Sequence, residues 1–516
     1  MKRNILQWTL AVVLLVGSLT ACDLNTTPST RAEEDLVLKD VENINKVLTG
    51  SMRTLMESFY TYANPGYGAF LRTGDAMGSD VAMNKKYGFS NQYGFHTLYS
   101  DGGTNIHSWN LGYKIIYNMN RALAAIDEAS GDDQLREVVK AQAYGMRAFM
   151  YLHYASNYSF AIDKDPNAVN VPIYDEHNFD KGLQPASNVS EVYAFVLEDV
   201  ARALDFLPAD YNRDEKWQID RAVLLGIGAR AALYSRNWKL AADYSDELLG
   251  LNSYLMNEKE YNEGFNDIQN REWLWGHAQT MDQQDASYQF NFLDVTSSSS
   301  YYYSFNADPY FRDLFDEGDY RKKMINWGID PGSDPLKQEF VWMRYNKFRF
   351  KKDNTADIVL MRTAEIYLIN AEAKTRLNSA DGLSKLNQLK AARDAQSVNL
   401  SGDELIQEIW LERRKELFGE GFSMVDIIRN QQKVVRKEYP QEPKITLTLN
   451  DKNGVPVTKD YIPQGHRIFK FPVKDNNEFV PNSKFYLYRI PEKEERLNKL
   501  IYSKYPRLDI YDTPQA

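Results

Sequence analysis

The sequence has 516 residues and a net charge of −10 at pH 7, with 61 basic and 71 acidic side chains. An acidic protein repels polyanions, so nucleic acid is excluded as an expected partner. The length suffices for a large buried core, and 34 tyrosines contribute to an aromatic content of 13%. Because tyrosine joins a flat apolar face to a hydroxyl, these residues suit both helix packing and a ligand-binding surface.

The amino-terminal segment has the pattern of an export signal. Lys2 and Arg3 precede a nearly continuous apolar run over residues 10–19, which ends in Leu19-Thr20-Ala21-Cys22. The run is too short for a membrane-spanning helix. We expect residues 1–21 to be a lipoprotein signal peptide, Cys22 to be the lipidation site and 22–32 to be a tether. A secretory signal with an incidental cysteine is the alternative. An exported, lipid-tethered globular protein is predicted.

Helical periodicity organises most of the remaining chain. Apolar stripes with short connections predict a first helix from 33 to about 62 and an antiparallel helix pair over 108–158. The further predicted helices cover residues 187–206, 220–234, 238–249, 361–377, 382–395, 402–419 and 423–430. Between them lie two irregular stretches, and a small hairpin is expected at 445–457. The pattern predicts a mainly helical protein.

The fold class that we predict is all-α, a tetratricopeptide-like helical repeat scaffold within one domain over 33–516. No strict 34-residue period is present, and the helical repeats are placed at about 108–250 and 357–430. The irregular parts are insertions at about 63–107 and 252–355 and a carboxyl-terminal part over 440–516. Because insertions on one face of such arrays commonly form the binding surface, we expect these insertions to hold the ligand.

Charged residues lie on the apolar faces of the predicted carboxyl-terminal helices. Arg413 falls at helical spacing with Ile406 and Leu417, so it should be buried and must then be paired. We expect a structural ion-pair network formed by Arg362, Glu365, Glu412, Arg413 and Asp426. A pair of catalytic carboxylates of the glycosidase kind is the alternative. The network is favoured because these residues occur in regular helices, and no enzyme is predicted.

Other catalytic and cofactor patterns are weak. Gly226-Ile227-Gly228-Ala229-Arg230-Ala231 matches a dinucleotide-binding pattern, but helix is predicted on both sides where a strand should precede it. The two glycines more simply allow close helix packing. The six histidines show no metal-ligand spacing, and Cys22 is the only cysteine. We therefore expect neither a metal nor a cofactor.

Aromatic and amide residues gather in the two irregular stretches. A sugar ring offers C–H faces that stack on flat side chains and hydroxyls that need polar partners. The ligand-binding residues that we predict are Tyr87, Asn91, Tyr93, His96, Tyr301, Tyr302 and Tyr303. The alternative is that these tyrosines only pack the loops onto helices. If residues 301–303 are extended, alternation should expose at least one tyrosine.

Two motifs resemble those of the SusD/RagB family. One is Arg362-Thr363-Ala364-Glu365-Ile366-Tyr367-Leu368-Ile369-Asn370-Ala371-Glu372-Ala373. The other is Ile409-Trp410-Leu411-Glu412-Arg413-Arg414-Lys415-Glu416-Leu417-Phe418-Gly419-Glu420-Gly421-Phe422. The resemblance implies a lipid-anchored protein of the outer membrane, exposed at the cell surface, that binds oligosaccharide and works with a SusC-like TonB-dependent transporter. A peptide ligand, as in the RagB branch, is the first alternative. A helical-repeat adaptor for another protein is the second.

Overall fold

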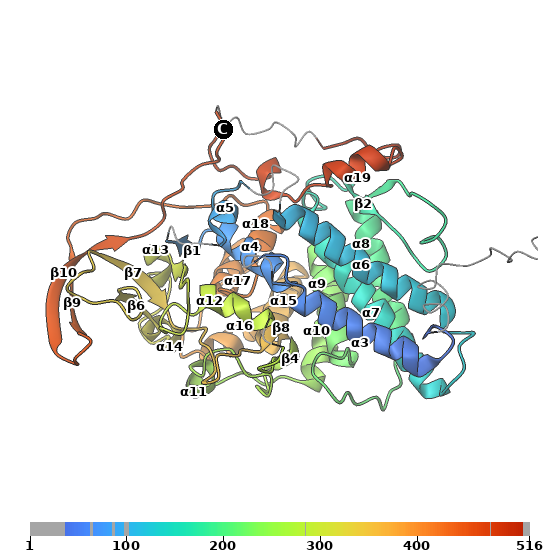
Figure 1. Ribbon diagram of the computed structural model, residues 1–516, viewed down its shortest axis with the longest axis horizontal. Coiled ribbons are helices and arrows are strands. Elements are labelled where there is room, and N and C mark those ends of the chain that lie inside the picture. Colours follow the sequence, from blue (N-terminus) through green and yellow to red (C-terminus); the bar gives the residue numbers. More distant parts are fainter. Residues whose placement is uncertain are drawn as a thin grey trace, which may run out of the picture.

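The computed structural model describes residues 37–61, 65–84, 88–96, 103–283, 285–474 and 476–508. The predicted signal peptide, Cys22 and the tether lie outside the described residues, as does Tyr87. Long helices occupy one half of the molecule, and a sheet with short helices occupies the other (Figure 1). None of the helices in the described ranges is long and apolar enough to cross a membrane.

The long helices pack in the order of the chain. They are α3 (Val41–Glu57), α6 (Gly103–Ala125), α7 (Asp133–Asn157), α8 (Val189–Phe206), α9 (Arg221–Tyr234) and α10 (Trp238–Leu251). From α6 onward each helix contacts the next, and α3 packs against both α6 and α7 (Figure 1). The predicted pair over 108–158 is therefore present as α6 and α7.

Local capping explains where several of these helices begin. The Asp132 carboxylate accepts the Leu135 N–H at the start of α7. Asn188 and Glu191 form a reciprocal capping box at the start of α8. Such side chains satisfy backbone donors that a helix leaves unpaired at its first turn. These short polar signals are readable in the sequence.

The carboxyl-terminal helices continue the helical half. α10 packs against α15 (Thr363–Arg376), and α15 packs against α16 (Asp381–Ala391) and α17 (Gly402–Glu416). α18 (Ser423–Arg429) follows. The helix predicted over 361–377 starts later than expected, because Met361 and Arg362 belong to a strand. Gly226 of α9 sits where a Cβ atom would lie 2.1 Å from the Met361 sulfur, so this glycine serves close packing.

The protein is mainly helical, as predicted, but a six-stranded sheet corrects the all-α class. Five strands follow the order β1 (Val81–Met83), β5 (Phe305–Ala307), β7 (Phe340–Tyr345), β10 (Pro456–Gln464) and β9 (Ile445–Asn450), and β6 (Ile325–Gly328) also pairs with β7. The hairpin expected at 445–457 is present as β9 and β10. β10 then extends to pair in parallel with β7. The other strands are too short for their periodicity to stand out in the sequence.

Two smaller sheets lie elsewhere: β2 (Val169–Pro172) with β3 (Ala186–Asn188), and β4 (Trp273–His277) with β8 (Ile358–Arg362). The short helices are α4 (Gly68–Met77), α5 (Ser90–Tyr93), α11 (Glu258–Tyr261), η1 (Ala286–Gln289), α12 (Phe290–Leu293), α13 (Pro309–Arg312), α14 (Tyr320–Lys323), η2 (Lys484–Tyr486) and α19 (Glu492–Leu497). The stretches predicted to be irregular therefore contain regular structure.

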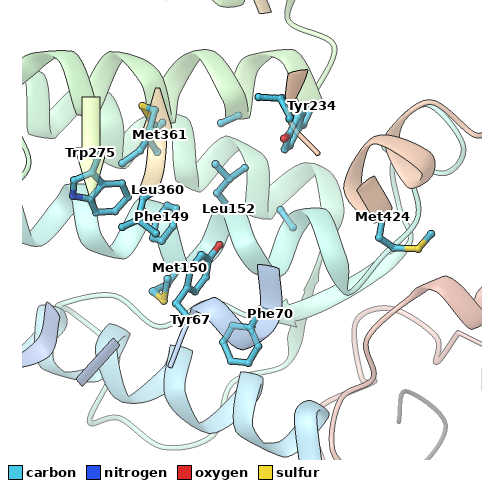
Figure 2. Packing of buried hydrophobic residues seen from close by; sticks show 14 of the residues in the cluster. Tyr67, Phe70, Phe149, Met150, Leu152, Tyr234, Trp275, Leu360, Met361 and Met424 are labelled. Carbon is cyan, nitrogen blue, oxygen red and sulfur yellow. The ribbon is translucent and has the colours of Figure 1, made fainter. Parts of the chain in front are cut away.

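A buried aromatic and aliphatic core joins the halves (Figure 2). The Phe149 ring of α7 lies edge-on to Trp275 of β4, with centroids 4.7 Å apart, and Tyr67 lies 4.9 Å from Phe149 on its other side. Tryptophan and phenylalanine each bury a large apolar area, so such contacts contribute strongly to stability. The core fixes the helices against the segments that carry the candidate site.

Candidate functional site

Aromatic side chains from three segments form a continuous row. The ring of Phe59, just after α3, lies edge-on to Tyr288 of η1 with centroids 5.3 Å apart. The hydroxyls of Tyr288 and Tyr302 share a 2.9 Å hydrogen bond, and the Tyr301 centroid lies 6.4 Å from that of Tyr302. Tyr301 is 74% exposed, Tyr60 57% and Phe59 47%. Tyr60 neighbours the row in the chain, and its own ring stacks on His107 at 5.7 Å between centroids. We call Phe59, Tyr60, Tyr288, Tyr301 and Tyr302 the aromatic surface.

Asn291 of α12 holds the loop that presents two of these tyrosines. Its side-chain oxygen accepts the Tyr301 N–H at 3.1 Å. Its backbone carbonyl accepts the Tyr302 N–H at 3.0 Å, the Tyr303 N–H at 2.8 Å and the Ser300 hydroxyl at 2.6 Å. A loop fixed in this way loses little conformational freedom when a ligand binds. The aromatic surface is therefore preorganised.

The two loops predicted to bind ligand are brought together through Phe292. Tyr302 stacks on Phe292 at 4.7 Å between centroids, and Phe89 meets the same ring edge-on at 5.1 Å. Gly88 has a positive φ of 90°, and a Cβ atom there would lie 2.2 Å from Phe292 Cε1. Glycine thus permits the close contact between the loops. The loop at 88–96 therefore contacts the aromatic surface indirectly, because Phe89 packs on Phe292 and Phe292 stacks on Tyr302.

Within the loop at 88–96, the predicted residues differ in accessibility. Tyr93 is 4% exposed, and its hydroxyl bonds His466 Nδ1 and accepts the Arg467 N–H, each at 3.0 Å. Because its polar atom is already occupied inside the protein, Tyr93 acts in packing and we withdraw it from the proposed surface. Asn91 and His96 are exposed. Their ligand role stays a prediction.

Tyr303 departs from the extended conformation considered for residues 301–303. Its φ is +35°, and its carbonyl accepts a hydrogen bond from Arg344 at 3.1 Å. The Arg344 guanidinium also lies 5.8 Å from the Tyr303 ring centroid and pairs with Asp330 at 2.8 Å. The turn directs the chain into β5, and at least one of the three tyrosines, Tyr301, is exposed as expected.

Sequence reasoning missed Phe59, Tyr60 and Tyr288. The first two were placed inside a helix that actually ends at Glu57. Tyr288 lies in Tyr-Gln-Phe-Asn, the same mixture of aromatic and amide residues that singled out the other loops. Composition could therefore have found Tyr288, whereas only the structure shows that the three segments meet.

The side chains of the aromatic surface suit a ligand that has an apolar face and many hydroxyl groups. The exposed rings offer apolar faces, and the exposed hydroxyls of Ser298 and Ser299 lie in the segment that leads to Tyr301. Aromatic rings with a few hydrogen-bonding groups around them are the usual composition of a small-ligand site. Among the described residues, no group of three or more His, Cys, Asp or Glu side chains could hold a metal ion.

A buried ion-pair cluster lies where β8, α14 and α17 meet. Glu416 accepts hydrogen bonds from Arg321 at 2.6 Å, Arg362 at 2.5 Å and Arg393 at 2.8 Å. Arg362 also contacts Glu420 at 2.7 Å. The members of the cluster, all buried, are Glu272, Asp319, Arg321, Lys347, Arg362, Arg393, Glu412, Glu416 and Glu420. We call this set the central ion-pair cluster.

The remaining residues of the predicted network pair nearby. Arg413 pairs with Asp426 at 3.0 Å. Glu365 pairs with Arg230 of α9 at 2.6 Å. Glu412 pairs with Arg321 at 2.6 Å. The structure thus places all five predicted residues in ion pairs, although the partners Arg230 and Arg321 come from segments that the sequence did not suggest.

These pairs shift the carboxyl pKa values. Burial acts to raise the pKa of Glu412, but the charges of Arg321, Lys415 and Lys390 outweigh burial and lower the pKa to about 2. A carboxylate with a lowered pKa in the folded state contributes stability that is complete above its unfolded pKa and is lost as the pH falls through the folded value. For Glu412 this loss is expected between about pH 4.5 and 2.

Glu412→Gln is expected to lower the free energy of unfolding by about 3 kcal/mol at pH 7, the equivalent of the pKa shift. The difference from wild type should shrink as the pH falls from 4.5 towards 2, because the wild-type carboxylate then also becomes protonated. Urea denaturation at a series of pH values measures this. Asp403→Asn, at an exposed position of the same helix, serves as the control. A difference independent of pH would contradict the electrostatic origin.

Comparisons with known proteins agree with the sequence motifs. A family model described as the SusD family matches residues 336–506, and one described as starch-binding, associating with outer membrane, matches residues 37–233. A solved SusD-like carbohydrate binding protein from Bacteroides vulgatus is 54% identical, with a TM-score of 0.89. The match covers 92% of this chain and 99% of that one. The chain belongs to the SusD/RagB family.

More distant relatives of this SusD/RagB protein are also known. A SusD-like protein of Formosa agariphila is 22% identical over 490 residues, which cover 83% of this chain and 91% of the relative. A solved putative sugar binding protein from Bacteroides vulgatus is 22% identical, with a TM-score of 0.71, and the match covers 90% of this chain and 98% of that one. At this identity the solved structure indicates the shared fold only. The resemblance of the two sequence motifs to SusD/RagB is confirmed.

Proposed function

We propose that this SusD/RagB protein is a non-catalytic lipoprotein of the cell surface that binds oligosaccharide or polysaccharide and delivers it to a SusC-like TonB-dependent transporter. The aromatic surface is the observation that carries the proposal. Phe59, Tyr60 and Tyr301 are exposed, the rings of Phe59, Tyr288, Tyr302 and Tyr301 follow one another in a row, and Asn291 fixes the loop that carries Tyr301 and Tyr302. The carbohydrate-binding description of the relative with 54% identity supports the same class of ligand.

Burial of the conspicuous carboxylates supports binding without catalysis. Glu365 and Glu412 are 1% and 0% exposed, and each is hydrogen-bonded to an arginine at 2.6–2.7 Å. A glycosidase needs its two carboxyl groups on either side of a bound sugar. Side chains that are enclosed by arginine and by helices cannot reach one. We therefore assign these glutamates to the stability of the fold.

Isothermal titration against panels of oligosaccharides and peptides tests the proposal. We expect at least one oligosaccharide class to bind, and chromatography of the incubated mixture to recover the sugar intact. Binding of peptides alone would replace the glycan by a RagB-like peptide ligand. Release of shorter sugars that is lost in Glu365→Gln or Glu412→Gln would overturn the non-catalytic assignment.

The anchor and the partner are further parts of the proposal. If Cys22 is acylated, Cys22→Ser should move the protein from the membrane fraction to the soluble fraction. Protease treatment of intact cells should then cleave the wild-type protein if it faces outward. A pull-down from solubilised outer membranes should recover a TonB-dependent barrel. Recovery of a different protein instead would favour the adaptor alternative.

A further inference from the structure

A second candidate site lies away from the aromatic surface. It is a pocket of about 700 Å³ between the segment that precedes α9, the end of α10 and the segment that leads into β4. α9 packs against both α10 and β4, and the three elements lie near one another in Figure 1. The volume is within the range of small-molecule sites. Tyr211, Tyr254 and Trp273 supply aromatic surface in its lining.

The charge of this pocket is opposite to that of the whole protein. Four cationic side chains line it, namely Arg213, Lys216, Arg221 and Arg271, against one carboxylate, Asp220. The chain as a whole carries a net charge of −10. We call this site the basic pocket. A cluster of cations within an acidic protein focuses a positive potential and favours an anionic ligand.

Two of the four cations are already neutralised. The Asp220 carboxylate contacts Arg213 at 3.0 Å and also accepts the Val223 N–H at 2.9 Å as the cap of α9. Arg221 pairs with Glu247 at 2.6 Å. Each oxygen of the lone carboxylate in the lining is therefore engaged, and Asp220 forms no ion pair with the remaining two cations.

Lys216 and Arg271 have no carboxylate within 4.0 Å among the residues that the structure describes. The half-buried Lys216 Nζ donates to the Asn270 carbonyl at 2.6 Å, which leaves two further N–H groups. The Arg271 guanidinium lies 4.1 Å from the Tyr254 ring centroid. A guanidinium that rests on an aromatic ring keeps its N–H edge available for an oxyanion. These two cations are the ones that a ligand would neutralise.

The surroundings of Lys216 make its charge responsive to an anion. Burial first, and then the charge of Arg213, lower the pKa of Lys216 to about 8, although Asp267 and Asp220 act to raise it. An anion bound beside Lys216 would favour its protonated form. Affinity should therefore be highest below about pH 8 and fall as the pH rises above it.

We propose that the basic pocket binds a saccharide that carries a carboxylate or a sulfate ester, with Lys216 and Arg271 contacting the oxyanion and the tyrosines contacting the ring. The saccharide part of this inference rests on the proposed function; the anion part does not. We assign neutral glycans to the aromatic surface, whose five residues carry no charged side chain. The protein would then have two sites that differ in the charge of the sugar they accept.

Saturation-transfer NMR and calorimetry with four probes test this: glucuronate, glucose 6-sulfate, glucose and inorganic sulfate. We expect at least one of the two acidic sugars to bind at least tenfold more tightly than glucose. Lys216→Ala and Arg271→Ala should each weaken that binding at least fivefold. Equal binding of glucose would overturn the anion part. Inorganic sulfate binding as tightly as the acidic sugars would overturn the saccharide part.

Two controls separate a specific site from net charge and from damage to the fold. Lys452→Ala, in the exposed turn between β9 and β10, changes the net charge equally and should leave binding unchanged. Lys216→Arg should retain binding and lose the decrease in affinity that we expect for wild type as the pH rises above about 8. Loss of acidic-sugar binding in the Lys452 variant would overturn the proposal. Tyr301→Ala tests the aromatic surface separately, so each site can fail alone.

Discussion

Glu416→Gln is expected to lower the free energy of unfolding by about 3–5 kcal/mol, the largest stability effect of any single change considered. The Glu416 carboxylate is fully buried and accepts hydrogen bonds from Arg321, Arg362 and Arg393. Glutamine removes the negative charge and turns an N–H donor toward three cations. The arginines would then be buried with too little opposite charge, which is far more costly than losing an exposed ion pair.

Urea denaturation followed by tryptophan fluorescence and circular dichroism measures this effect. Glu404→Gln, at an exposed position of the same helix, should change stability by less than about 0.5 kcal/mol. Glu416→Asp keeps the charge but shortens the side chain, so we expect a smaller loss than with glutamine. A Glu416→Gln protein as stable as the Glu404 control would show that the cluster contributes little to the fold.

Tyr301→Ala is expected to weaken oligosaccharide binding at least tenfold, or about 1.4 kcal/mol. Tyr301 is the most exposed member of the aromatic surface, and its backbone is fixed by Asn291. Exposed aromatic side chains on a rigid support commonly provide a large share of binding energy. Because its ring projects into solvent, truncation should leave the stability of the protein nearly unchanged.

Matched variants identify the cause of any loss at Tyr301. Tyr301→Phe keeps the flat ring and should stay within threefold of wild type. Tyr117→Ala removes another exposed tyrosine, from α6, and should have no effect on this ligand. Calorimetric titration of all three variants with the same oligosaccharide is the measurement. If Tyr301→Ala bound the oligosaccharide with wild-type affinity, the row of rings would not be the binding site.

The helical half was predictable because its signals are local. The apolar stripes of α6, α8 and α10 recur every three to four residues, and capping residues such as Asn188 mark where helices begin. The sheet was not predictable in this way. Its parallel pair joins Ile462 of β10 to Phe340 of β7, which are far apart in the chain. No short window of sequence records such a pairing.

The charged core was predictable only in part, for a related reason. Glu412 and Arg413 stand among apolar residues of a long helix, so their burial could be inferred from spacing. Arg321 and Glu272 belong to a four-residue helix and a loop, where no periodicity shows which side is buried. Their burial follows from tertiary packing. The sequence therefore identified one partner of several buried ion pairs but not the other.

The candidate binding site was likewise predictable from the sequence only in part. Composition pointed to Tyr301 and Tyr302, since tyrosines surrounded by serine and asparagine are unusual in a simple core loop. It could not distinguish Tyr93, whose hydroxyl is used inside the protein, from a tyrosine that faces solvent. It also could not place Phe59 beside Tyr288, because that contact depends on how α3 packs.

A crystal structure of the protein with its tightest neutral oligosaccharide tests the central claim most directly. We predict sugar rings stacked on the aromatic surface, with Tyr301 and Phe59 in contact and the loop held by Asn291 in the conformation seen here. A neutral oligosaccharide bound elsewhere, with the rings of the aromatic surface free of ligand, would contradict the account.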